Sequence, residues 1–134
     1  MVSGADTLKM QVNLFVSGRN LKSMDTFSQS DPICLLFEQI NGNWVKKGMT
    51  EQIKNQKNPD FATSFSVDYF FEKVQNLKFV FLDGDGKIDD ISDDDKIGEI
   101  SVKMGQLMGA RKQMFEAPLE GANRGQIVVR TQAI

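Results

Sequence analysis

The sequence contains no histidine, one cysteine and three prolines in 134 residues. Without histidine the chain lacks the usual general base and most zinc-binding patterns, and Cys34 has no imidazole to activate its thiol. Neither a Gly-x-Ser-x-Gly nucleophile motif nor a phosphate-binding P-loop is present. We therefore expect a protein that is not an enzyme.

Long apolar runs are absent as well. No run approaches the roughly 18 residues that a membrane-spanning helix needs. The first residues lack the apolar core of a signal peptide, and a glycine for myristoylation is missing at position 2. The lone Cys34 cannot form an internal disulfide and lies in an apolar stretch, which predicts a core residue in a reducing compartment. We expect one cytoplasmic domain spanning residues 1–134, with its core at about 10–133.

The apolar residues form many short runs instead. Residues 10–17 place Met10, Val12, Leu14 and Val16 on one face, as in a half-buried strand. Asn41-Gly42 is a strong hairpin signal. The segment 106–112 is a candidate short helix, and the phenylalanines at 65, 70, 79 and 81 are expected in the core. The pattern predicts an all-β fold, an eight-stranded antiparallel sandwich, with strands at 10–17, 33–40, 44–53, 61–71, 77–82, 97–104, 113–119 and 126–131.

One stretch, residues 83–95, concentrates negative charge. It carries seven aspartates and one lysine, so its charge is −6 while the other residues together carry +4. Either the loop is a solvated turn, or a cation lies among its oxygens, and hard carboxylate donors suit Ca²⁺. An EF-hand is excluded, because aligning Gly86 with its invariant glycine puts Phe81 and Ser92 at the two main ligand positions. No basic stripe suggests nucleic acid as a partner.

A second acidic turn precedes the second predicted strand. It holds Asp25 and Asp31, six residues apart, and ends at Pro32. Together with Asp83-x-Asp85, and with Asp95 just before a Lys-Ile-Gly-Glu segment, this arrangement resembles a C2 domain, the calcium-dependent membrane-binding β-sandwich. The resemblance implies Ca²⁺ as the cofactor and a ligand set in two loops: Asp25, Asp31, Asp83, Asp85 and Asp95, with Asp93 or Asp94 as substitutes for Asp95.

Further segments resemble the first C2 domain of copines, most specifically the sequence VDYFFEKVQ at 67–75. Copines carry two C2 domains and a von Willebrand A-like domain, so the chain resembles one excised module with the type II C2 strand order. The resemblance implies calcium-dependent binding to anionic phospholipid such as phosphatidylserine. It also implies a cytoplasmic protein that is recruited to the plasma membrane or other membranes when calcium rises, and that has possible protein clients. The alternative is a calcium-independent protein-interaction module on the same scaffold.

Two further groups of residues are candidate membrane contacts. Phe27, Ile88 and Ile91 are apolar residues in polar loops, and they either tuck inward or enter lipid once calcium is bound. Lysines around a tryptophan form the other group, which either binds phosphoinositide head groups, as in many C2 domains, or protects an edge hairpin. Its members are Trp44, Lys46, Lys47, Lys54 and Lys57.

Overall fold

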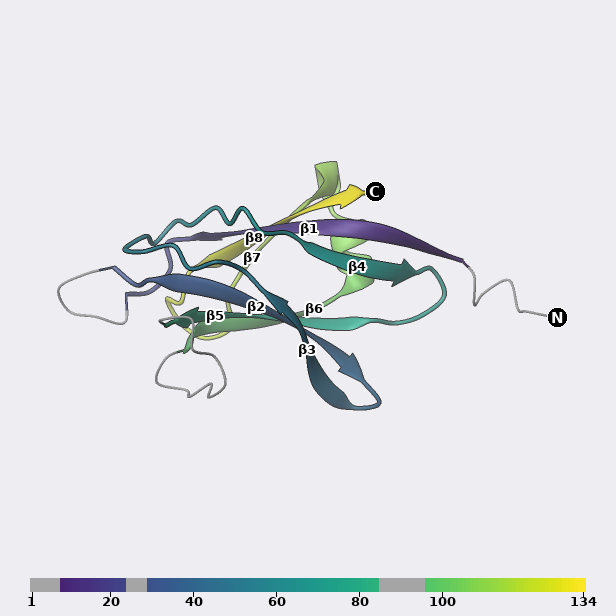
Figure 1. Cartoon of the computed structure of the whole chain (residues 1–134), viewed down its shortest axis with the longest axis horizontal. Coiled ribbons are helices and arrows are strands. Elements are labelled where there is room, and N and C mark those ends of the chain that lie inside the picture. The colour runs from purple at the N-terminus through teal and green to yellow at the C-terminus, as the bar shows by residue number, and fades with distance from the viewer. Residues whose placement is uncertain (1–7, 24–28, 85–95) are drawn as a thin grey trace.

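The computed structural model describes residues 8–23, 29–84 and 96–134. Eight strands form two antiparallel sheets that pack face to face, as Figure 1 shows. The first sheet has the order β4-β1-β8-β7 and the second the order β3-β2-β5-β6. The strands are β1 (Lys9–Arg19), β2 (Pro32–Ile40), β3 (Asn43–Met49), β4 (Phe65–Phe70), β5 (Asn76–Asp83), β6 (Lys96–Lys103), β7 (Met114–Pro118) and β8 (Gln126–Ala133). The predicted eight-stranded antiparallel sandwich is confirmed.

The core between the sheets follows from strand alternation. Val12, Leu14 and Val16 of β1 are each at most 1% exposed, whereas their sequence neighbours are half-buried or exposed. Phe79 and Phe81 of β5 are fully buried among them. Cys34 is buried as expected. Phe65 also lies in the core.

Phe70 is the exception to the predicted set of core phenylalanines. It is only partly buried, at the end of β4, and Lys73 places its Nζ 4.8 Å from the centre of its ring. Tyr69, its neighbour, packs against the core instead. The prediction of Phe70 as a core residue is therefore wrong, because the strand ends there and the ring faces a lysine rather than the opposite sheet.

Two central strands of the second sheet are buried on both faces. Cys34 and Leu36 of β2 point into the sandwich, and their neighbours Ile33 and Leu35 point outward. On the outer face the latter pack with Val80 and Leu82 of β5, and Phe37 lies against them. A continuous apolar run such as 33–36 is typical of such a doubly buried strand.

The hairpin between β2 and β3 turns where it was predicted. Asn41 and Gly42 have φ values of 52° and 82°, the pair of positive angles that a type I′ turn requires. The strand after the turn is shorter than expected, because β3 ends at Met49 and the segment 50–64 is irregular. Its backbone is held instead by side chains: Thr50 Oγ1 accepts a hydrogen bond from the Cys34 amide at 2.9 Å.

A short helix, α2 (Met104–Met108), follows β6, somewhat earlier than the candidate segment 106–112. The side chain of Gln106 accepts a hydrogen bond from the Lys103 amide at 2.9 Å and so caps its first turn. A single 3-10 turn, η2 (Arg111–Gln113), comes next. Lys112 and Gln113 there have φ values of 57° and 60°, a left-handed conformation that is strained in residues other than glycine.

Candidate functional site

The two acidic segments of the sequence meet at one end of the sandwich. β2 begins and β5 ends at this end, and Pro32 is directly opposite Asp83 in their antiparallel register (Figure 1). Asp31 precedes β2 and Asp83 is the last residue of β5. The structure thus brings together two of the five predicted calcium ligands. The other three, Asp25, Asp85 and Asp95, lie outside the described residues, as do the substitutes Asp93 and Asp94.

Hydrogen bonds hold the two carboxylates in place. The Asp31 amide donates to Asp83 Oδ1 at 2.9 Å, and the Asn55 amide donates to Asp31 Oδ1 at 2.6 Å. The Asp31 carbonyl also accepts a hydrogen bond from Gln52 Nε2 at 3.2 Å. Both carboxylates are only half-buried, so they lie at the surface of the sandwich end with their orientation set by the backbone.

Asn55 is a functional candidate that the sequence did not reveal. It lies on the irregular segment after β3 and adopts a φ of 51°, which asparagine tolerates better than most residues. Its amide contacts Asp31, and its side-chain Oδ1 accepts a hydrogen bond from the Gln29 amide at 2.9 Å. One residue therefore fixes both residue 29 and Asp31. The only sequence signal was an asparagine in a polar segment.

These side chains fit the donor chemistry of calcium. Asp31 and Asp83 present carboxylate oxygens, the hard ligands that Ca²⁺ prefers. Within the described ranges, the hydrogen bonds from protein use Oδ1 of each carboxylate. Those residues contain no cluster of three or more histidine, cysteine, aspartate or glutamate side chains suited to a metal. Asp31 and Asp83 would thus need ligands from elsewhere in the chain to hold an ion.

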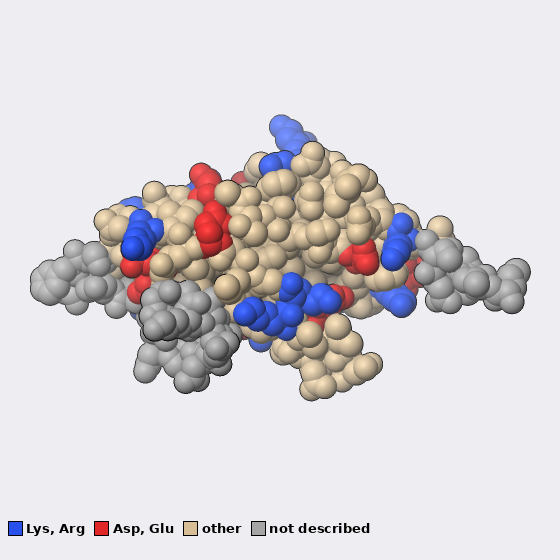
Figure 2. Space-filling view, in the orientation of Figure 1, with Lys and Arg blue, Asp and Glu red and all other residues tan. Residues whose placement is uncertain are grey.

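Part of the predicted lysine group lies on the outer face of the second sheet. Lys46 of β3, Phe37 of β2 and Lys78 of β5 are register neighbours across three strands. Lys78 Nζ lies 4.6 Å from the centre of the Trp44 ring and 5.5 Å from that of Phe37. Figure 2 shows Lys and Arg side chains gathered at the base of the β2–β3 hairpin. Lys78 is a member of this surface that sequence reasoning missed.

The remaining lysines of that group are separated from it. Lys47 lies 3.9 Å from Glu38 in an ion pair. Lys54 and Lys57 are exposed on the segment that follows β3, and the Lys57 carbonyl accepts a hydrogen bond from the Leu21 amide at 2.9 Å. They therefore lie beside the end that holds Asp31. The five predicted residues occupy two places in the fold rather than one.

Another pair of polar contacts ties the first sheet to the irregular segment. Arg19 donates a hydrogen bond to Asp60 Oδ1 at 2.7 Å. This hydrogen bond, with one from Ser17, lowers the pKa of Asp60 below its usual value, against a small opposing effect of burial. Ser17 and Asp60 also form an isolated antiparallel bridge. Among the described elements, no helix is long and apolar enough to span a bilayer.

Comparisons with known proteins agree with this geometry. The sequence model described as "C2 domain" matches residues 9–119. Copine-D of Dictyostelium discoideum is 37% identical over an alignment of 134 residues that covers 94% of this chain and 25% of that protein. The chain thus spans about a quarter of the curated relative. This similarity agrees with the resemblance to copines.

Solved structures support the same fold. The first-named C2 domain of a plant Extended Synaptotagmin 1 superimposes with a TM-score of 0.65 at 15% identity, covering 93% of this chain and 95% of that one. A calcium-bound pair of C2 domains from Extended-Synaptotagmin 2 gives a TM-score of 0.65 at 14% identity, covering 92% of this chain and 45% of that one. With the family match over most of its length, the chain belongs to the C2 domain family.

Proposed function

We propose that the domain binds anionic phospholipid membranes in a calcium-dependent manner. The observation that carries this proposal is the meeting of Asp31 and Asp83, where a carboxylate from each of two acidic segments lies at one end of the sandwich. The ion would be held there by Asp25, Asp31, Asp83, Asp85 and Asp95. The solved Extended-Synaptotagmin 2 C2 domains, which share the fold, were determined in a calcium-bound form.

Bound calcium would supply positive charge that offsets the acidic cluster and attracts lipid phosphate. The protein's own residues do the rest. Asn55 and the Asp31 amide orient the carboxylates before an ion arrives, so less ordering is needed on binding. Lys54 and Lys57 are exposed beside this end. Each lysine brought near an anionic surface contributes about 1 kcal/mol.

The outer face of the second sheet provides a second contact with lipid head groups. Lys46 is exposed there, and Lys78 lies between two aromatic rings. Cation–π contacts keep the ammonium group of Lys78 at a fixed place on the face. We propose that head-group phosphates contact these two lysines once the loops have docked, and that Trp44 lies at the same contact.

Co-sedimentation with phosphatidylserine liposomes tests the proposal. We expect binding in millimolar calcium, none with chelator, and loss of calcium-dependent binding in Asp31→Asn. Asp68→Asn is a matched control, because Asp68 pairs with Lys9 on β4 of the other sheet. Equal binding with and without calcium would instead favour the calcium-independent interaction module and would overturn the proposal.

A salt series separates electrostatic docking from insertion of Phe27, Ile88 or Ile91, which lie outside the described residues. The Debye length shrinks from about 10 Å at 0.1 M salt to about 3 Å at 1 M. We expect calcium-dependent binding to fade over that range, since an electrostatic contact is screened and hydrophobic transfer is not. Strong binding at high salt that Phe27→Ala with Ile88→Ala removes would establish insertion instead.

We further propose that the domain has no catalytic activity, consistent with a sequence without histidine. In the cell it would be cytoplasmic and recruited to the plasma membrane or other membranes when calcium rises. Imaging of a fluorescent fusion before and after a calcium ionophore tests this location. A signal that stays uniform after the ionophore would contradict it.

A further inference from the structure

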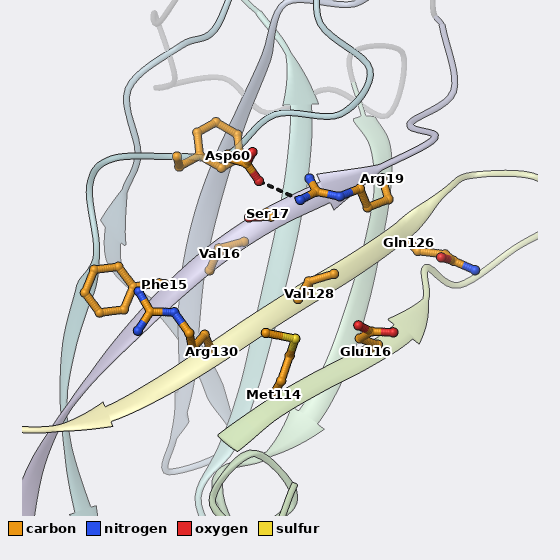
Figure 3. Close-up of a pocket in the computed structure, with 11 residues that line it drawn as sticks. Phe15, Val16, Ser17, Arg19, Asp60, Met114, Glu116, Gln126, Val128 and Arg130 are labelled. Carbon is orange, nitrogen blue, oxygen red and sulfur yellow. Dashed lines mark hydrogen bonds and ion pairs between the residues drawn. The ribbon is translucent and has the colours of Figure 1, made fainter. Parts of the chain in front are cut away.

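The outer face of the first sheet carries a groove that the proposed membrane contact does not use. Its first part is a depression of about 380 Å³ over β1, β8 and β7. Phe15, Val128 and Met114 line it with apolar surface (Figure 3). Phe15 and Val128 are half-buried and Met114 is 43% exposed, so a partner could cover them and remove apolar area from water.

Positive charge borders this apolar floor. The guanidinium of Arg130 lies 4.3 Å from the centre of the Phe15 ring, in the stacked geometry of a cation–π contact. Figure 3 shows Arg130 beside Phe15, with Arg19 further along β1 and paired with Asp60. Within the described part of the chain, Arg130 has no carboxylate partner. Its guanidinium is therefore oriented by the ring but still available to an anion.

The groove continues past β7. A second hollow of about 540 Å³ shares Met114 and Glu116 with the first and adds Arg111 and Lys112. Both of these cations are exposed, and neither has an ion-pair partner among the residues that the structure describes. Lys112 is held in the strained left-handed turn of η2, and strained backbone is often retained where it presents a functional side chain.

Charge and shape together specify the ligand. Four cations line the two hollows against two carboxylates, and Arg19 already neutralises one of those, Asp60. The groove is open and crosses three strands, which suits an extended chain rather than a small enclosed ligand. An apolar floor between cationic ends is complementary to a peptide with an apolar side chain between acidic ones.

We propose that this groove binds an extended acidic segment of a partner protein. An apolar side chain of that segment covers Phe15, Val128 and Met114, and its carboxylates contact Arg130 at one end and Arg111 and Lys112 at the other. The groove lies on the face of the sandwich opposite to Lys46 and Lys78. A domain docked on lipid through that other face leaves the groove open to a protein, so the two interactions are independent.

Fluorescence anisotropy with a labelled nonapeptide, EDEEFEEDE, tests the proposal in the presence of chelator. We expect Arg130→Gln with Lys112→Gln to weaken binding about tenfold, since bidentate guanidinium–carboxylate contacts are strong. Lys46→Gln with Lys78→Gln removes the same charge from the opposite face and should change the affinity less than about twofold. A peptide with serine in place of phenylalanine should bind about fivefold more weakly.

Other outcomes overturn the proposal. Equal weakening by the two double variants, or equal binding of the phenylalanine and serine peptides, would mean non-specific attraction to a basic surface. Loss of phosphatidylserine liposome binding in the groove variant, with peptide binding retained, would make this face a membrane contact. Self-association in sedimentation equilibrium that Arg130→Gln abolishes would make the occupant a second copy of the chain.

Discussion

The main-chain amide of Asp31 donates a hydrogen bond of 2.9 Å to Oδ1 of Asp83, a residue 52 positions further along the chain. One predicted ligand therefore orients the other before any ion binds. The contact links the start of β2 to the end of β5, which are adjacent strands of one sheet. Removing the acceptor at position 83 should consequently affect both carboxylates and not only one.

Asp83→Asn and Asp83→Ala should separate these two roles. Asparagine keeps an oxygen that can accept the Asp31 amide, so we expect unchanged stability without calcium and at least about tenfold weaker calcium binding. Alanine removes the acceptor as well and should also lower the free energy of unfolding in chelator by about 1–2 kcal/mol. Calorimetric calcium titration and urea unfolding measure the two effects. Calcium affinity unchanged in Asp83→Asn would show that this carboxylate is no ligand.

Calcium itself should raise the melting temperature, because it binds the folded ligand set and not the unfolded chain. At a hundred times the dissociation constant the gain is about 2.7 kcal/mol, or roughly 10 °C for a domain of this size. Magnesium should do much less, since it requires strict octahedral geometry. Differential scanning calorimetry with each ion checks this, and an unchanged melting temperature in millimolar calcium would argue against the metal site.

The fold was accessible from the sequence because its signals are local. The alternation of Val12, Leu14 and Val16 and the Asn41-Gly42 dipeptide each predict a structure over a few residues, and the structure confirms both. The position of Asp31 beside Asp83 followed from the order of strands and loops. Periodicity therefore predicts which elements form, and topology predicts which ends meet.

What the sequence did not reveal depends on contacts between distant residues. Asn55 orients Asp31 through its main-chain amide, which any residue but proline carries. Lys78 is distinguished only by the rings of Trp44 and Phe37 on neighbouring strands. The segment 50–64 has apolar residues that suggested strands, but its hydrogen bonds go to side chains of other elements. A single sequence carries no mark of such partners.

Glu51 should stabilise the irregular segment in a pH-dependent manner. Burial alone would raise its pKa, but hydrogen bonds from the amides of Ala62, at 2.6 Å, and Thr63, at 3.1 Å, outweigh that effect and lower the pKa. The folded pKa thus lies below the unfolded one, so the stabilisation is present above about pH 4 and is lost as the pH falls through the folded pKa.

We expect Glu51→Gln to lower the free energy of unfolding by about 1 kcal/mol at neutral pH, since the side chain is largely exposed and solvent screens the carboxylate. The difference from the wild type should disappear at acidic pH. Urea unfolding of both proteins from pH 7 downward measures it. Glu72→Gln serves as a control on an exposed loop. A difference that stays constant with pH would show that the charge of Glu51 is not involved.

Cys34 should be unreactive in the folded protein. It is fully buried, and burial raises the pKa of its thiol well above the usual range, so almost no thiolate forms near neutral pH. Ellman's reagent should label it only as fast as the protein unfolds, and completely in concentrated guanidinium chloride. Added calcium should slow the labelling by stabilising the folded state. Rapid labelling of the native protein would mean that the core opens locally around β2.

Gly125 should tolerate no side chain. Its φ is +107°, and a Cβ there would lie 2.7 Å from the Asn20 carbonyl oxygen and 2.8 Å from Leu21 Cα. We expect Gly125→Ala to lower the free energy of unfolding by about 2–3 kcal/mol. Gly105→Ala is the control, because no atom lies within 4 Å of its Cβ position, and in α2 it should be neutral or stabilising by up to about 1 kcal/mol. Thermal unfolding compares them, and equal melting temperatures would contradict the close approach.

The burial of β2 and β5 on both faces also has a consequence in time. Amides between two covered faces exchange their hydrogens only when the whole domain unfolds, whereas exposed segments exchange through small openings. Asp31 and Asp83 adjoin the ends of these slowly exchanging strands. Each arrival or departure of an ion would therefore be registered in the exchange rates of the adjoining segments alone, and the central strands would keep the same exchange clock through many cycles of membrane attachment.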